Sequence, residues 1–184
     1  MPMLKTRLLL LVSIGAAFAL TAPLAGCGYS LAGRGSFLPE YIRTIGIPLF
    51  GNLSSVSDVD RILTERVRNE FINRGRYKVI TDRTGADAVL VGDVTSITFV
   101  PAAFTAQQQA SRYALVLTAK IEFTDLKQNK VLWQNPALQF REEFDVTTST
   151  AQDVNAFFGQ NADALQRVST EFARTIVSAI LEAF

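Results

Sequence analysis

Apolar positions recur with two different periods in the first half of the chain beyond residue 43. A short apolar segment occupies residues 44–50 and is typical of a strand. In residues 59–71 the apolar side chains fall on one helical face, with Ser57 or Asp58 available as the capping residue and Gly75 as the stop. The pattern therefore predicts a short strand followed by an amphipathic helix.

The middle of the chain is patterned as strands. Residues 77–80 form a short apolar segment, and residues 88–100 alternate with period two, interrupted at 92–93 in a way that suggests a bulge. Pro101 is expected to end this strand. Residues 101–111 are small and polar, so they are predicted to be a loop longer than an ordinary hairpin turn.

The last part of the chain combines strands with one long helix. Residues 112–125 alternate cleanly between apolar and mostly polar side chains, and shorter strand segments follow at 131–133 and 138–146. Pro136 between them indicates an edge strand or a bulge. From residue 161 to 184 the apolar side chains return to helical spacing, after a polar connection at 147–155.

This order of elements predicts the fold class. A strand and a helix followed by a run of strands and a closing helix favour an α+β two-layer sandwich. We expect a mainly antiparallel (mixed) sheet of about four strands with two helices on one face, within a single domain over residues 44–184. The opposite sheet face must then meet water or a partner.

The amino-terminal segment reads as a secretory signal. Lys5 and Arg7 precede an apolar run at residues 8–20, which is short of the about 20 residues needed to span a bilayer. The run leads into Leu24-Ala25-Gly26-Cys27, which resembles the lipobox of bacterial lipoproteins. That resemblance implies removal of residues 1–26, covalent diacylglyceryl and N-acyl groups on Cys27, and a lipid-anchored tether at 27–43.

The sequence leaves one alternative to the lipid anchor and contains one residue that bears on its membrane. An ordinary cleaved signal followed by a free thiol is the alternative to lipidation, although a lone secreted cysteine would then lack a partner. By resemblance to lipoprotein sorting in Gram-negative envelopes, Gly28 favours the outer membrane over the inner membrane.

Composition narrows the chemistry. Without the first 26 residues, which carry Lys5 and Arg7, the chain has 16 basic and 17 acidic residues, so nothing indicates nucleic-acid binding. There is no histidine and one cysteine, which excludes a Ser-His-Asp triad and leaves only carboxylates for a transition metal. We therefore expect that the protein is not an enzyme and that it has no metal site and no cofactor beyond the acyl groups on Cys27.

Several segments together resemble the lipopolysaccharide-assembly lipoprotein family, LptE. They lie at residues 27–31, 45–52, 86–92 and 177–184, in the order of the family, and cover nearly the whole mature chain. The resemblance implies a lipoprotein on the periplasmic side of the outer membrane that plugs the β-barrel protein LptD. It also implies that the pair delivers lipopolysaccharide to the outer leaflet.

Candidate contact residues follow from the chemistry of lipopolysaccharide, which presents phosphates and carboxylates beside acyl chains. Its contacts should combine basic side chains with apolar surface, although solvated charges and edge protection are the ordinary explanation for strand lysines and arginines. The basic candidates are Arg112, Lys120, Lys127, Lys130 and Arg141, and the aromatic candidate is Phe104 in the predicted loop. Among them, the turn with Lys127 and Lys130 gathers two bases without an intervening acid.

Two other functions compete with this interpretation. A carboxylate-only hydrolase finds no support in the spacing, because Glu142 and Glu143 are neighbours on a strand, point to opposite faces and cannot act on one atom. The alternative function is an outer-membrane lipoprotein that activates a peptidoglycan synthase or forms part of a secretion pore, since such families resemble the chain at residues 45–50 and in the helix that follows.

Overall fold

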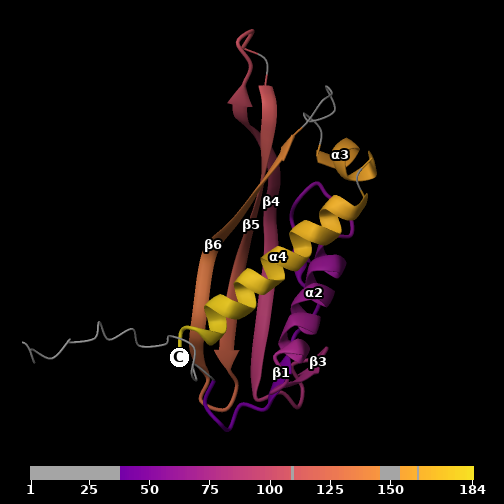
Figure 1. The fold of residues 1–184 in the computed structure, drawn as a ribbon. Helices are drawn as coiled ribbons and strands as arrows, with labels where there is room; N and C mark the ends of the chain where they lie inside the picture. The colour runs from indigo at the N-terminus through magenta and orange to yellow at the C-terminus, as the bar shows by residue number, and fades with distance from the viewer. Residues whose placement is uncertain (1–37, 109, 146–153, 161) are drawn as a thin grey trace, which may run out of the picture. The chain divides into compact units, whose positions relative to one another are not determined.

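The computed structural model describes residues 38–108, 110–145, 154–160 and 162–184 (Figure 1). Cys27, the predicted signal segment and most of the predicted tether therefore lie outside the described residues. The elements follow in the order β1 (Thr44–Gly46), β2 (Gly51–Asn52), α2 (Val59–Asn73), β3 (Lys78–Ile80), β4 (Ala88–Phe104), β5 (Ala110–Asp125), β6 (Lys130–Asp145), α3 (Val154–Gln160) and α4 (Ala162–Leu181).

The strands form one mixed sheet in the order β3-β1-β4-β5-β6, with β2 also paired to β4. β1 runs parallel to β3 and β4, whereas the long strands β4, β5 and β6 are antiparallel neighbours. The predicted α+β class with a mixed sheet is confirmed. Among the described residues the sheet has six strands instead of about four. The predicted strand at 44–50 is strand only over β1, and the two-residue β2 follows it; between them the Phe50 N–H donates to Thr64 Oγ1 of α2 at 3.0 Å.

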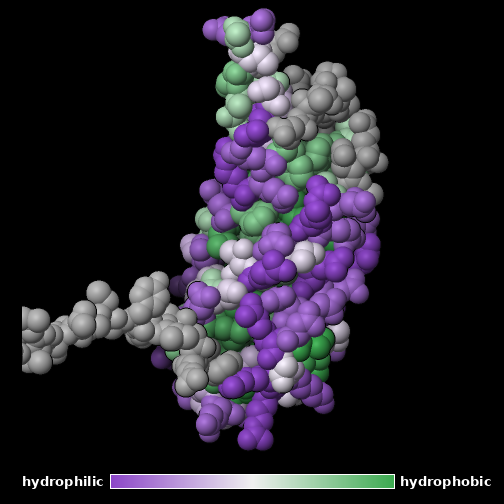
Figure 2. All heavy atoms as spheres, in the orientation of Figure 1, coloured by the Kyte–Doolittle hydropathy of each residue, from purple (hydrophilic) through white to green (hydrophobic). Residues whose placement is uncertain are grey.

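Helices α2 and α4 pack on the same face of the sheet, as the apolar periodicity predicts (Figure 1). Asp58 is the N-cap residue of α2, as predicted, but its backbone is left-handed and its side chain makes no capping hydrogen bond. The position of the cap is therefore confirmed, whereas capping by the side chain is wrong. Seen from the helix side, hydrophilic side chains cover most of the outer surface of both helices (Figure 2). Their inward-facing side chains include Leu63, Val67, Phe71, Val168, Phe172, Ile176 and Ile180, all with no exposed surface.

The hairpin of β4 and β5 is longer than the sequence indicates. β4 continues through Pro101 to Phe104, and β5 begins at Ala110, so the prediction of a loop over 101–111 is wrong. Proline is tolerated there because β4 beyond Val94 pairs only with β5 among the described residues, which leaves the other edge of β4 without a ladder that needs the missing N–H. We call residues 100–104 and 110–114 the arm.

The interruption predicted at 92–93 has a packing cause. Gly92 and Asp93 pair in regular register with β5, and the register shift lies between Val94 and Ser96. A Cβ on Gly92 would lie 2.8 Å from Cδ1 of Ile121 and 3.0 Å from the ring of Phe50. A larger residue would force these side chains to shift, so the close packing favours glycine at this position.

β6 is an edge strand of the described sheet, as Pro136 predicts. A register shift relative to β5 falls between Asn135 and Leu138, around that proline. Beyond it, Phe140 and Phe144 both face the helix layer, where Phe140 contacts Phe172 with ring centroids 5.9 Å apart. The predicted common side of the two phenylalanines is therefore confirmed.

The pattern of the sequence does not reveal helix α3. This helix begins at Val154, inside the segment expected to be a polar connection, of which residues 146–153 lie outside the described part. Its Phe157 is buried and contacts the rings of Phe99 and Phe144 with centroids 4.9 Å and 5.1 Å away. A helix of seven residues is too short for apolar spacing to identify it.

Candidate functional site

Three of the basic candidates share the sheet face opposite the helices, whereas Lys130 begins β6 opposite the buried Asp125. Arg112 and Lys120 alternate with the buried side chains of β5, as predicted, and the strand register brings Arg141 of β6 onto the same face beside Val116. Eight residues of strand separate Arg112 from Lys120, which corresponds to about 26 Å. The two bases therefore cannot contact one phosphate together.

Ion pairs further distinguish these bases. Glu143 lies between two arginines, 3.6 Å from Arg112 and 3.7 Å from Arg141. The side chain of Lys120 is exposed and forms no ion pair or hydrogen bond among the described residues. Exposed pairs of this kind contribute little to stability, so the arginines stay accessible, and Lys120 is the least engaged base on this face.

Phe104 ends β4 at the end of the arm and is 63% exposed. The sequence pattern placed it in a loop, which is wrong, but its exposure agrees with the expectation for a contact residue. No charged residue occurs between Asp93 and Arg112. The arm therefore presents an exposed aromatic ring and uncharged side chains, and Arg112 is its one charged residue.

Lys127 takes part in a polar cluster at the other end of the hairpin. Its Nζ lies 2.7 Å from Oδ1 of Asp87 and donates to the backbone oxygen of Tyr41 at 3.2 Å. Oδ2 of Asp87 accepts hydrogen bonds from the backbone N–H groups of Arg43 and Thr44. The hydrogen bond from Lys127, followed by those backbone donors, lowers the pKa of Asp87 to about 2.

Asp125 completes this cluster of Tyr41, Asp87, Asp125 and Lys127, which we call the clasp. It is fully buried and accepts hydrogen bonds from the Tyr41 hydroxyl at 2.5 Å and from the backbone N–H groups of Lys127 and Gln128 at 2.7 Å and 3.1 Å. Burial raises the pKa of Asp125, but these hydrogen bonds outweigh it and lower the pKa overall. The clasp therefore links residues 41–44, which precede and begin β1, to the β5–β6 turn.

The two lysines predicted at the β5–β6 turn differ in their surroundings. The charge of Lys127 is engaged by Asp87, whereas Lys130 is exposed and has no ion pair among the described residues. Lys130 is therefore the less engaged of the two lysines. The sequence could not indicate this, because Asp87 lies forty residues away from Lys127 and meets it only through the sheet.

We predict that Asp87→Asn lowers the free energy of unfolding at pH 7 by about 1–3 kcal/mol, since it removes a charge that accepts several hydrogen bonds. The pKa of Asp87 is lower in the folded state than its ordinary value of 3.8, so its stabilising effect is present above that value and is lost as the pH falls towards about 2. Urea unfolding at pH 7 and pH 2.5 measures both effects.

The matched control is Asp93→Asn, which changes an exposed carboxylate on β4 in the same way. We expect its unfolding free energy to stay within about 0.5 kcal/mol of wild type. Equal losses in the two variants, or a loss in Asp87→Asn that is unchanged at pH 2.5, would contradict the role assigned to the clasp.

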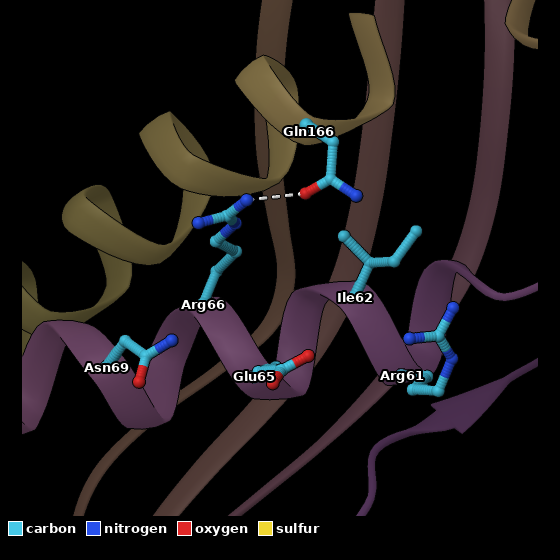
Figure 3. A pocket seen from close by; sticks show the side chains of 6 residues that line it. All are labelled: Arg61, Ile62, Glu65, Arg66, Asn69 and Gln166. Carbon is cyan, nitrogen blue, oxygen red and sulfur yellow. Dashed lines mark hydrogen bonds between the residues drawn. The ribbon is translucent and has the colours of Figure 1, made fainter. Parts of the chain in front are cut away.

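A shallow pocket of about 270 Å³ lies between α2 and α4 (Figure 3). Arg66 crosses from α2 and donates to Oε1 of Gln166 on α4 at 2.6 Å. Arg61 and Glu65 also line it, so both signs of charge are present. The hydrogen bond fixes the two helices to each other, and the mixed charges favour no single class of ligand.

Glu142 and Glu143 point to opposite faces of β6, as predicted. Glu142 is paired in register with Leu115 on the helix side, and Glu143 with Ala114 on the open side. Glu142 lines a second cleft, beside α4, which the sequence pattern did not indicate. The available signal was an acid at the position that Phe140 and Phe144 mark as inward-facing.

The described residues offer no metal-binding cluster. Within ranges 38–108, 110–145, 154–160 and 162–184, no group of three or more His, Cys, Asp or Glu side chains is placed to hold a metal ion. None of the helices in those ranges is long and apolar enough to cross a membrane.

These features define an α+β sandwich domain with an open polar sheet face, a projecting arm and a clasp at the opposite end of the hairpin. The model of the LptE family, described as lipopolysaccharide-assembly, matches residues 42–180. The chain belongs to this family, and the family resemblance seen in the sequence is confirmed.

Solved structures share the fold at low sequence identity. A dodecamer of a single-residue variant of PelC from Paraburkholderia phytofirmans has a TM-score of 0.50 and 14% identity, covering 78% of this chain and 92% of that chain. The hypothetical protein CT253 from Chlamydia trachomatis has a TM-score of 0.52 and 9% identity, covering 76% and 95%. At these identities the likeness concerns the fold alone.

A weaker similarity links the chain to the rare lipoprotein B from Shewanella oneidensis, with a TM-score of 0.49 and 15% identity over 75% of this chain and 93% of that chain. No curated protein sequence matches the chain.

Proposed function

We propose that this protein is an outer-membrane lipoprotein that plugs an LptD-type β-barrel, assists its assembly and helps to deliver lipopolysaccharide to the outer leaflet. The observation that carries this proposal is the LptE-family match over residues 42–180. The Leu24-Ala25-Gly26-Cys27 sequence adds the lipid anchor, on the periplasmic side of the membrane. In this proposal the protein acts by binding, without catalysis and without a cofactor beyond its acyl groups.

The dimensions of the domain are compatible with this role. The clasp binds Tyr41, close to where the chain enters the described domain, to the start of the β5–β6 turn. From Asp125 to Ala110, β5 spans about 50 Å, whereas the hydrocarbon layer of a bilayer is about 30 Å thick. If the end with the clasp lies at the periplasmic surface and the strands run along the membrane normal, the arm reaches across the full depth of the membrane. It would lie inside a barrel whose lumen is polar.

The glycolipid contacts follow from which side chains stay available. Lys120 and Lys130 are bases without an ion pair among the described residues, and Phe104 is the exposed aromatic ring of the arm. Lys127 has the shortest ion pair of these bases, at 2.7 Å from Asp87, so we rank it after the others. We therefore assign phosphate contacts first to Lys120, then to Arg112 within the arm, and acyl contacts to Phe104.

The test of the proposal is a purification of the tagged full-length protein from outer membranes in mild detergent, with mass spectrometry of its partners. A large β-barrel recovered in about equal amount supports the proposal. Recovery of a peptidoglycan synthase, or of further copies of this chain alone, would replace it by the alternative of an activator or a pore subunit.

A further inference from the structure

A cleft of about 280 Å³ opens between the edge strand β6 and helix α4. Glu142 forms part of its wall on the side of the sheet that Phe140 and Phe144 pack against the helix layer. The other lining residues come from α4 and are Gln166, Arg167, Thr170 and Glu171. The cleft thus combines the aliphatic parts of these side chains with two carboxylates and one guanidinium group.

One oxygen of Glu142 is left without a partner. Oε2 is buried from solvent and accepts no hydrogen bond among the described residues. Burial raises the pKa of Glu142, and the nearby charge of Arg167 lowers it without reversing the shift, since Glu171 acts in the opposite direction. A buried acceptor in this condition destabilises the free domain.

The neighbouring polar groups are already engaged elsewhere. Oε1 of Gln166 accepts from Arg66, and the Thr170 hydroxyl donates to the backbone oxygen of Gln166 at 2.8 Å. Arg167 is not buried and forms no ion pair with Glu142 among the described residues. The cleft therefore lacks a donor for Oε2, although adjacent Glu143 has two arginines.

We propose that this cleft receives a lysine or arginine side chain of a protein partner, whose cationic group donates to Oε2 of Glu142. The stem of such a side chain is apolar and its head is charged, which matches a cleft where aliphatic parts of side chains surround the buried Oε2 atom of Glu142. Glu171 is already paired with Arg174, whose Nη1 lies 2.9 Å from Oε1 of Glu171, whereas Glu142 has no ion pair among the described residues. Glu142 is therefore the carboxylate of the cleft that a further cation would neutralise. Access is direct because β6 is the edge strand of the described sheet.

A bound metal ion fits the site less well than a partner's side chain. Hard cations require six or more oxygen ligands, mostly carboxylates and carbonyls. The cleft offers two carboxylates beside a guanidinium group, and the described residues contain no larger cluster of acids. The occupant is therefore a basic side chain, and this inference rests on the proposed function in taking the β-barrel as the protein that supplies it.

The experiment compares Glu142→Gln with Glu143→Gln in the full-length protein. The two residues are adjacent and undergo the same change, but Glu143 faces the opposite, solvated side of β6. Two quantities are measured for each variant: the melting temperature of the isolated protein, and the rate at which the barrel dissociates from it after purification in mild detergent.

We expect Glu142→Gln to leave the melting temperature unchanged or raise it, because a neutral amide is easier to bury than a carboxylate. The same variant should accelerate dissociation of the barrel by about tenfold or more, since it removes one charge of a buried pair. Glu143→Gln should change neither quantity beyond about twofold in rate, as expected for exposed ion pairs.

Unchanged dissociation in Glu142→Gln overturns the inference, and so does a fall in melting temperature of Glu142→Gln, which would show that the carboxylate serves only the fold. Failure of the proposed function looks different, because the wild-type protein itself then recovers no barrel.

Discussion

Replacing Cys27 by serine is expected to move the protein from the membrane fraction to the soluble periplasmic fraction. A single acyl chain gives marginal, reversible membrane binding, whereas two or more chains anchor a protein stably. The diacylglyceryl group needs the cysteine sulfur, so serine removes every chain attached through it together with the processing that precedes N-acylation. The effect should therefore be close to complete, and fractionation followed by immunoblotting measures it.

The matched measurement is the stability of the released protein. Cys27 lies outside residues 38–184, which contain the whole described core, so the melting temperature should match that of the wild-type protein after its anchor has been cleaved off. Recovery of the barrel with the soluble variant should fall as well, since the anchor holds the two proteins on one surface. If Cys27→Ser remained in the membrane fraction through high-salt and carbonate washes, the assignment of the anchor would be wrong.

The parts of the fold that periodicity predicted are those with one buried and one solvated face. β5 alternates between buried and more exposed side chains from Leu115 to Asp125, and α2 and α4 carry continuous apolar faces, so the positions of these elements follow from local pattern. The arm did not follow, because whether Pro101 ends a strand depends on whether its outer edge has a neighbour. That is a property of the sheet order, which the local sequence does not contain.

The candidate site likewise contains features that local sequence pattern predicts and features that it does not. Sequence chemistry selected Arg112, Lys120 and Phe104, and strand alternation placed the two bases on one face correctly. It could not show that Lys127 already pairs with Asp87, which is distant in the chain. Local pattern therefore finds which side chains face outward, but only the tertiary structure shows which charges are already neutralised.

Glu142 shows that both kinds of information are needed together. Its position between Phe140 and Phe144 marks it as inward-facing by period two, yet an inward-facing acid is ordinarily satisfied by a partner within the fold. The structure adds that Oε2 has no such partner among the described residues. A group that lowers the stability of the free domain is understandable if it acts in a complex.

The largest stability effect is expected for Phe172→Ala. Phe172 has no exposed surface and joins α4 to β6 through its contact with Phe140. Removing a buried phenylalanine side chain costs about 3–5 kcal/mol, because transfer free energy is lost and a cavity remains. For a domain of this size that corresponds to a fall in melting temperature of about 10 °C, which calorimetry measures.

Phe104→Ala is the control, since it removes the same atoms from a side chain that is 63% exposed, and its unfolding free energy should change by less than about 1 kcal/mol. The pair also separates stability from binding. Phe172→Ala should weaken recovery of the barrel only in proportion to unfolding, and a lower temperature should restore it, whereas no temperature should restore the binding that Glu142→Gln weakens. Equal thermal losses in the two phenylalanine variants would mean that α4 does not hold β6 through Phe172.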